Sequence, residues 1–263
     1  MTVGHAPAGD APPRTTTLMG LGLAPLTEEQ TIEHVLDALD RGDGGWLCPV
    51  NLDVLRQTVE DPALNRLVAQ ADLAVADGMP LVWASRLQGQ PLPARVAGST
   101  LVRTLSERAA ARDRSVYLLG GNQGVAAEAA VRLRTDYPGL RIAGHRCPPF
   151  GFERDARERE AIAGDLRRTN PDIVFVGLGF PKQDKLIVDL RSVLPGAWFV
   201  SCGISFSFVT GEIQRAPVLV QRLGLEWVSR MIQEPRRLGR RYLVDGLPFA
   251  ARLALSSLRL RSR

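Results

Sequence analysis

Short apolar runs alternate with helix-like segments through most of this chain, and this alternation restricts the fold more than any other feature. In these runs apolar residues follow one another directly instead of occupying every second position, which is typical of strands covered on both faces of a parallel sheet. The predicted strands are residues 46–50, 73–76, 115–119, 140–144, 173–177 and 198–202. We therefore expect an α/β fold with a mainly parallel sheet and helices on both faces.

Helices are predicted between these strands from apolar spacing and capping residues. Thr27 and Gln30 form a capping box at the start of the first helix, and Ser99 or Thr100 is the expected cap of a later one. The other predicted helices are residues 52–58, 62–69, 80–87, 100–112, 125–136, 158–169, 181–190, 217–223 and 227–232.

The charge distribution divides the chain. We expect a disordered leader at 1–17, an α/β core at 18–220 and a basic amphipathic appendage at 221–263. The appendage holds ten arginines and three acidic residues, whereas the whole chain has a net charge of only +5. A basic tail on a mildly acidic body indicates an anionic partner: a membrane surface, a nucleic acid or a phosphorylated substrate.

Composition excludes several classes of protein. With 45% hydrophobic and 23% charged residues, the bulk of the chain is globular. Its three cysteines are widely spaced and lack a CxxC pair, which argues against a disulfide framework and a zinc site and favours a reducing compartment. We see no apolar stretch of about 18 residues and no secretory signal, so a cytoplasmic location is expected.

Glycines follow several predicted strands, at the edge where parallel sheets bind ligands. Gly120, Gly121, Gly179 and Gly203 would let a backbone approach a nucleotide or sugar nucleotide closely. The alternative is that they only form turns. The sequence contains no GxGxxG, no GxxxxGK[ST] and no DxD pair, so a dinucleotide fingerprint, a P-loop and a chelated metal lack support.

Polar residues at the strand ends are candidates for chemistry. Asp77 has an apolar strand behind it, and a partly desolvated carboxylate suits a general base; the alternative is a cap for the helix near Pro80. Asn51 either orients a ligand or caps a helix. Gln183 and Asp184 fall in a first helical turn, where acids are common.

The basic appendage has its own pattern. Arginines at 230, 237 and 241 fall near one helical face, where guanidiniums could bind a diphosphate. Interleaved leucines would enter a lipid headgroup layer, and they argue, with the lack of an aromatic platform, against nucleic-acid binding. The alternative is a solvated helix docked on the core.

Seven ordered motifs resemble a known family. They are VNLDVL at 50–55, ADLAVADGMPLVW at 71–83, RVAGSTL at 95–101, YLLGG at 117–121, GLGFPKQD at 177–184, GEIQRAP at 211–217 and GLEWVSRMIQEPRRLGRRYL at 224–243. On these residues the chain resembles the WecG/TagA/CpsF glycosyltransferases, which implies the compact α/β fold called GT-E.

The resemblance also implies an activity. Such hexosyltransferases move N-acetylmannosamine or its uronic acid from a UDP donor to an undecaprenyl-diphosphate-linked sugar, with inversion and without a metal or other cofactor, at the inner face of the plasma membrane. The family's proposed base falls on Asp77, and its sugar-pocket residues fall on Asn51, Arg95 and Gln183. Its diphosphate-binding arginines fall on Arg230, Arg237 and Arg240.

Two positions depart from the family pattern. Pro49 stands where the family usually has threonine, and Asp184 stands where it usually has glutamate. Because Pro49 removes a hydroxyl, a non-catalytic, nucleotide-sugar-binding regulatory protein is the alternative hypothesis.

Overall fold

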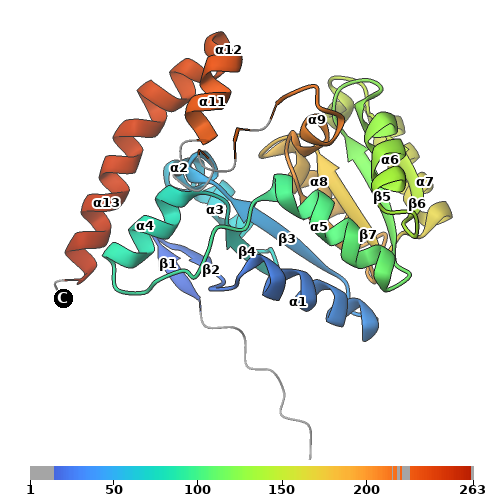
Figure 1. The fold of residues 1–263 in the computed structure, drawn as a ribbon, viewed down its shortest axis with the longest axis horizontal. Coiled ribbons are helices and arrows are strands. Elements are labelled where there is room, and N and C mark those ends of the chain that lie inside the picture. Colours follow the sequence, from blue (N-terminus) through green and yellow to red (C-terminus); the bar gives the residue numbers. More distant parts are fainter. Residues whose placement is uncertain (1–14, 215, 218–219, 221–225, 262–263) are drawn as a thin grey trace, which may run out of the picture.

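The core of the protein is one six-stranded parallel sheet. The computed structural model describes residues 15–261 apart from 215, 218–219 and 221–225, and its sheet has the order β4-β3-β8-β7-β5-β6 (Figure 1). The strands are β3 (Gly45–Val50), β4 (Leu73–Ala76), β5 (Ser115–Gly120), β6 (Arg141–Arg146), β7 (Ile173–Gly177) and β8 (Trp198–Ser201). All six predicted strands and their parallel pairing are confirmed.

Helices cover both faces of the sheet, because alternate strand residues point to opposite sides. In β5, Val116 and Leu118 enter one apolar cluster, whereas Tyr117 and Leu119 enter the other. The first cluster is covered by α1 (Glu28–Asp40), α5 (Gly98–Ala111), α6 (Val125–Asp136) and α9 (Ser205–Thr210). The second is covered by α2 (Leu52–Glu60), α3 (Pro62–Val68), α4 (Met79–Leu87), α7 (Ala156–Thr169) and α8 (Lys182–Arg191).

The amino-terminal part corrects the predicted leader. Residues 16 and 17 belong to an antiparallel hairpin of β1 (Thr16–Leu18) and β2 (Leu21–Leu23), and residues 1–14 lie outside the described part. Leu18, Leu21 and Leu23 are buried in the core, so three apolar side chains hold the hairpin despite its threonine-rich start. The prediction of a leader extending to residue 17 was therefore wrong at its end.

Helix starts follow capping chemistry only in part. The capping box is confirmed, since the Thr27 side chain and the Gln30 side chain each accept a backbone N–H from the other residue. The prediction for α5 was wrong: the helix begins earlier, after Ala97, without a side-chain cap from Ser99 or Thr100. Within the core, two short helical elements were not predicted, namely α9 and the 3₁₀ turn η1 (Phe152–Arg154).

The carboxyl-terminal segment, residues 226–261, runs along one side of the sheet (Figure 1). Its elements are α11 (Glu226–Gln233), α12 (Pro235–Gly239), the π-helical η2 (Arg240–Gly246) and α13 (Leu247–Arg261). The predicted helix at 217–223 falls largely outside the described residues. Phe249 and Leu253 of α13 are buried where this helix packs on α4. Among the described helices, none is long and apolar enough to cross a bilayer.

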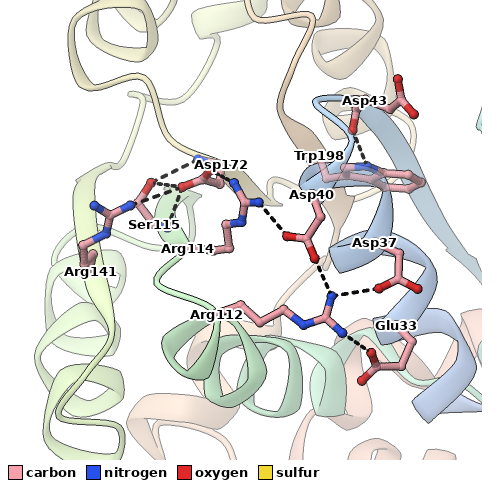
Figure 2. A network of polar contacts seen from close by, with 10 residues as sticks. All are labelled: Glu33, Asp37, Asp40, Asp43, Arg112, Arg114, Ser115, Arg141, Asp172 and Trp198. Atoms are coloured by element: carbon pink, nitrogen blue, oxygen red, sulfur yellow. Dashed lines mark hydrogen bonds and ion pairs between the residues drawn. The ribbon is translucent and has the colours of Figure 1, made fainter.

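An ion-pair network ties together the amino-terminal ends of the strands, as Figure 2 shows. Asp172, just before β7, accepts hydrogen bonds from the Ser115 backbone at 2.7 Å and from Arg114 at 3.1 Å. Arg114 also pairs with Asp40 of α1 at 2.6 Å, and Arg112 pairs with Asp37 at 2.8 Å. The network fixes α1 and the sheet at the edge opposite to the one where parallel sheets bind ligands.

We expect Asp172→Asn to lower the free energy of unfolding by about 1–3 kcal/mol, because the Arg114 guanidinium and the Ser115 donors lose a charged acceptor. Burial raises the pKa of Asp172, but hydrogen bonds from Ser115 and Arg114 outweigh it and hold the pKa below its ordinary 3.8. The carboxylate therefore stabilises the fold above that value, and its contribution falls away at lower pH. Urea unfolding should show a constant difference from pH 5 to 8 that narrows below pH 3.8. Asp113→Asn, at a side chain 83% exposed, is the control and should change little.

Candidate active site

Asp77 lies directly after β4, at the carboxyl edge of the sheet, and is half-buried. Its backbone N–H donates to the Val50 carbonyl at 2.8 Å, which fixes it beside the end of β3. The alternative prediction, that Asp77 caps α4, was wrong: Gly78 is the N-cap residue and α4 has no side-chain cap. Asp77 Oδ2 instead accepts the Gly98 backbone N–H, at 3.4 Å, in the first turn of α5.

The first turn of α5 meets the ends of three strands. A Cβ added to Gly98 would lie 3.4 Å from the Ser201 carbonyl oxygen and 3.6 Å from Cγ of Pro49, so β8 and β3 approach it closely. The strands β4 and β8 lie on opposite sides of β3. Parallel sheets bind ligands at the carboxyl ends of strands where the strand order reverses, so this edge is the candidate ligand crevice. The first turn of α5, with the partial positive charge of a helix start, lies at this edge beside the Asp77 carboxylate.

Pro49 is accommodated in β3 although proline has no backbone N–H to donate to a neighbouring strand. β3 pairs with β8 only as far as Leu47, so the missing backbone N–H of Pro49 removes no hydrogen bond to that strand. The apolar ring of Pro49, and not a hydroxyl, therefore stands near the start of α5.

Asn51 is a helix cap. Its Oδ1 accepts the backbone N–H groups of Asp53 and Val54 at 3.0 Å each, so the capping interpretation is confirmed. Nδ2 takes no part in the cap. Its use toward a ligand stays a prediction.

The glycines after the strands use most of their N–H groups within the protein. Gly121 donates to the Gly177 carbonyl at 2.8 Å, and Gly179 and Gly203 both donate to Gln183 Oε1 at 3.1 Å. At Gly120, with φ of +115°, an added Cβ would lie 2.4 Å from the Gly177 carbonyl oxygen, so only glycine fits. The turn interpretation accounts for these positions, and phosphate binding by them stays a prediction.

Gln183 and Asp184 lie in the first turn of α8, and both are buried. Gln183 is 6% exposed, and its side-chain oxygen Oε1 links the loops after β7 and β8. Asp184 is 0% exposed, and its Oδ1 accepts the Ser201 hydroxyl at 2.7 Å. First-turn preference alone did not indicate that this acid is enclosed by the core.

Arg95 binds the carboxyl-terminal segment. Its guanidinium pairs with Glu226 of α11 at 2.6 Å, and both side chains are less than one-fifth exposed. Arg230 of α11 lies 5.8 Å from the ring centre of Phe208 in α9. These contacts hold α11 beside α9 and beside the segment that precedes α5.

The expected single arginine face was wrong. α11 ends at Gln233, and Glu234 has φ −131° and ψ 60° because the following proline disfavours helical geometry. Arg230 therefore stands on a different helix from Arg237, Arg240 and Arg241. Arg240 is exposed, and the side chain of Arg237 is outside the described part. Arg241 pairs with Asp53 of α2 at 2.9 Å, two positions from Asn51.

Several residues of this region were missed by sequence reasoning. Glu226 pairs with Arg95, and Asp53 pairs with Arg241 as well as with Arg56 of its own helix. The two pairings between residues far apart along the chain have no local pattern in the sequence. Phe150, in the loop after β6, is fully exposed, with the Lys182 ammonium 4.8 Å from its ring centre. Its place after two prolines was the one available signal.

Among the residues that the structure describes, no three His, Cys, Asp or Glu side chains gather closely enough to hold a metal ion. Cys48 and Cys202 are free thiols buried in the core.

A parallel sheet with a half-buried carboxylate at its carboxyl edge and a basic segment nearby is typical of an α/β enzyme that binds an anionic ligand at that edge. The sequence model of the Glycosyl transferase WecG/TagA/CpsF family matches residues 16–263. The chain belongs to this family and is a glycosyltransferase.

A relative whose name gives its activity is also a glycosyltransferase. The N-acetylglucosaminyldiphosphoundecaprenol N-acetyl-beta-D-mannosaminyltransferase of Bacillus spizizenii (strain ATCC 23059 / NRRL B-14472 / W23) is 33% identical over 199 residues. The match covers 76% of this chain and 75% of that relative.

Proposed function

We propose that the chain transfers N-acetylmannosamine, or its uronic acid, from a UDP donor to a sugar carried on undecaprenyl diphosphate, in the assembly of a cell-surface polysaccharide or teichoic-acid-like polymer. The activity named for the relative supports the sugar and the lipid-linked acceptor. The observation that carries the proposal is the Asp77 carboxylate at the carboxyl edge of the sheet, next to the first turn of α5.

Asp77 is the proposed general base. A carboxylate at the carboxyl edge takes the proton from the acceptor hydroxyl while its oxygen attacks the anomeric carbon, and the bond to UDP breaks on the opposite side of the sugar. One displacement of this kind inverts the anomeric centre. The Gly98 N–H keeps the carboxylate oriented toward the crevice during the step.

The departing UDP carries negative charge. In the proposed mechanism this charge is met by guanidinium groups of the carboxyl-terminal segment, namely Arg230, Arg237 and Arg240, and by the start of α5, without a metal ion. The pairing of Arg95 with Glu226 supports this, because it holds α11 near the candidate site.

The same segment is proposed to bind the inner face of the plasma membrane. Of the ten exposed large apolar side chains in the described part, seven lie in residues 226–261. They are Ile232, Leu243, Val244, Leu247, Leu255, Leu258 and Leu260. Exposed arginines accompany them, so anionic lipid would meet both apolar and basic groups.

The test is release of UDP in the presence of a lipid-linked N-acetylglucosamine acceptor, with a panel of UDP-sugars as donors. We expect turnover with UDP-N-acetylmannosamine or its uronic acid, an inverted anomer in the product by NMR, and an unchanged rate in EDTA. Turnover without the acceptor serves as the control. UDP binding without turnover on any acceptor would favour the regulatory alternative, and loss of activity in EDTA that Mg²⁺ restores would refute metal independence.

A further inference from the structure

The Gln183 side chain is a hydrogen-bond acceptor that two loops share at the carboxyl edge of the sheet. Its Oε1 accepts the backbone N–H of Gly179, after β7, and that of Gly203, after β8, at 3.1 Å each. An amide oxygen has two lone pairs, and these two bonds use both of them. The accepting end of the buried Gln183 amide is therefore occupied within the protein.

The two bonds do different things. The bond from Gly179 is local, since a first-turn side chain that accepts an N–H just ahead of its helix is a form of helix capping. The bond from Gly203 is not local, because 20 positions separate that residue from Gln183. Capping of α8 needs only the first bond, so the second serves the placement of the loop after β8.

That loop packs closely on neighbouring strand ends. A Cβ added to Gly177, the last residue of β7, would lie 2.9 Å from the Gly203 carbonyl oxygen and 3.0 Å from the ring of Phe206 in α9. A Cβ added to Gly121, after β5, would lie 3.4 Å from the same ring. The loop after β8 and the start of α9 thus lie directly against the ends of β7 and β5, where a shift would be felt at several strands.

α9 joins this loop to the carboxyl-terminal segment. The helix begins at Ser205, two residues after Gly203, and carries Phe208. The guanidinium carbon of Arg230 lies 5.8 Å from the centre of the Phe208 ring, within the range of cation–π attraction. The loop that Gln183 holds therefore leads into the helix that supports Arg230, one of the arginines proposed to meet the departing diphosphate.

We propose that Gln183 is a positioning residue: it fixes the loop after β8 against the loop after β7, and through α9 it fixes the place of Arg230 at the candidate active site. This role differs from the sugar contact that the family resemblance implies for Gln183. The effect on the loops is independent of the enzyme's substrates, whereas the effect on UDP binding rests on the proposed function.

Gln183→Leu tests the hold on the loops, because leucine has a similar volume and accepts no hydrogen bond. We expect hydrogen exchange at the Gly203 and Gly179 amides, measured by NMR, to become on the order of tenfold faster, which is the effect of losing a typical hydrogen bond. Gln183→Glu keeps an accepting oxygen whether its carboxyl is ionised or protonated, so it should keep slow exchange at both amides. Gln70→Leu, at an exposed position before β4, makes the same change at the opposite edge and should leave exchange unchanged.

Ligand binding separates positioning from a sugar contact. In the positioning role, Gln183→Leu should weaken the binding of UDP itself on the order of tenfold, because small displacements of binding groups have effects of this size. A direct sugar contact predicts weaker binding of the UDP-sugar and unchanged binding of UDP. A role in stability alone predicts a lower unfolding midpoint and unchanged affinity of the folded protein for both ligands. Calorimetry well below the midpoint measures both affinities.

Gln183→Asn replaces Gln183→Leu if the leucine variant does not fold, because asparagine stays polar while its shorter side chain withdraws the acceptor from Gly203. Unchanged Gly203 exchange in the folded variant, or unchanged affinity for UDP, would overturn the positioning role. If the wild type neither binds UDP nor turns over while the exchange result holds, the proposed function fails and the hold on the two loops stands.

Discussion

Asp77→Asn is expected to lower kcat for UDP release by about 10²–10⁴-fold, the range that a positioned general base contributes. Asparagine keeps an oxygen that can accept the Gly98 N–H, so the first turn of α5 and the affinity for UDP should be retained. Steady-state kinetics and UDP binding by calorimetry, measured on the same preparations, separate the chemical step from binding.

The matched control for this experiment is Asp43→Asn. Asp43 lies just ahead of β3, at the opposite edge of the sheet, and its side chain is 64% exposed. The variant should keep wild-type kcat and the wild-type unfolding midpoint. If Asp77→Asn retained a third or more of wild-type kcat, Asp77 would not be the base.

Replacing three leucines of α13 together is expected to weaken binding to anionic vesicles on the order of 100-fold, or about 2.7 kcal/mol in total. Each leucine is only about half exposed, so lipid would bury only part of the side chain, and each contributes less than the roughly 1.5–3 kcal/mol of full burial. Leu247, Leu255 and Leu258 share one face of the helix by their spacing, opposite Phe249 and Leu253, which are buried against α4. The change of all three to glutamine should leave α13 docked on α4. Vesicle sedimentation measures the affinity.

Turnover distinguishes anchoring from chemistry in the same variant. The rate with a lipid-linked acceptor in vesicles should fall with the binding, whereas the rate with a short, water-soluble acceptor should not. Val131→Gln, at a residue of α6 that is 60% exposed, removes an apolar side chain elsewhere and should bind vesicles normally. Equal binding by the triple variant and the wild type would show that this face does not contact lipid.

Much of the fold follows from local patterns. The continuous apolar runs predict five of the six strands of the sheet, because a strand buried on both faces has little room for polar residues. The sixth, the edge strand β6, is partly exposed and carries Arg141, His145 and Arg146. The capping box at Thr27 predicts the start of α1 because both partners lie within one turn. The hairpin of β1 and β2 was missed because its strands are three residues each, too short to show a period.

The site was less predictable, because its contacts join residues that are distant in sequence. The strand end at Asp77 could be read from the chain, but its partner Gly98 begins a helix 21 positions later. Arg95 and Glu226 are 131 positions apart, and their pairing exists only once the sheet has formed. A first-turn acid such as Asp184 looks like surface chemistry until neighbouring strands enclose it.

The two edges of the sheet are stabilised by different kinds of interaction. Ion pairs among α1, β5 and β7 brace the amino-terminal edge, while the opposite edge is made of glycine loops and single hydrogen bonds. We therefore expect the loops at the carboxyl edge to tolerate replacement better than the ion-paired residues at the amino-terminal edge. The preference for a sugar donor can then change, among descendants of this gene or by design, through exchange of these loops, while the ion pairs at the other edge keep the protein folded.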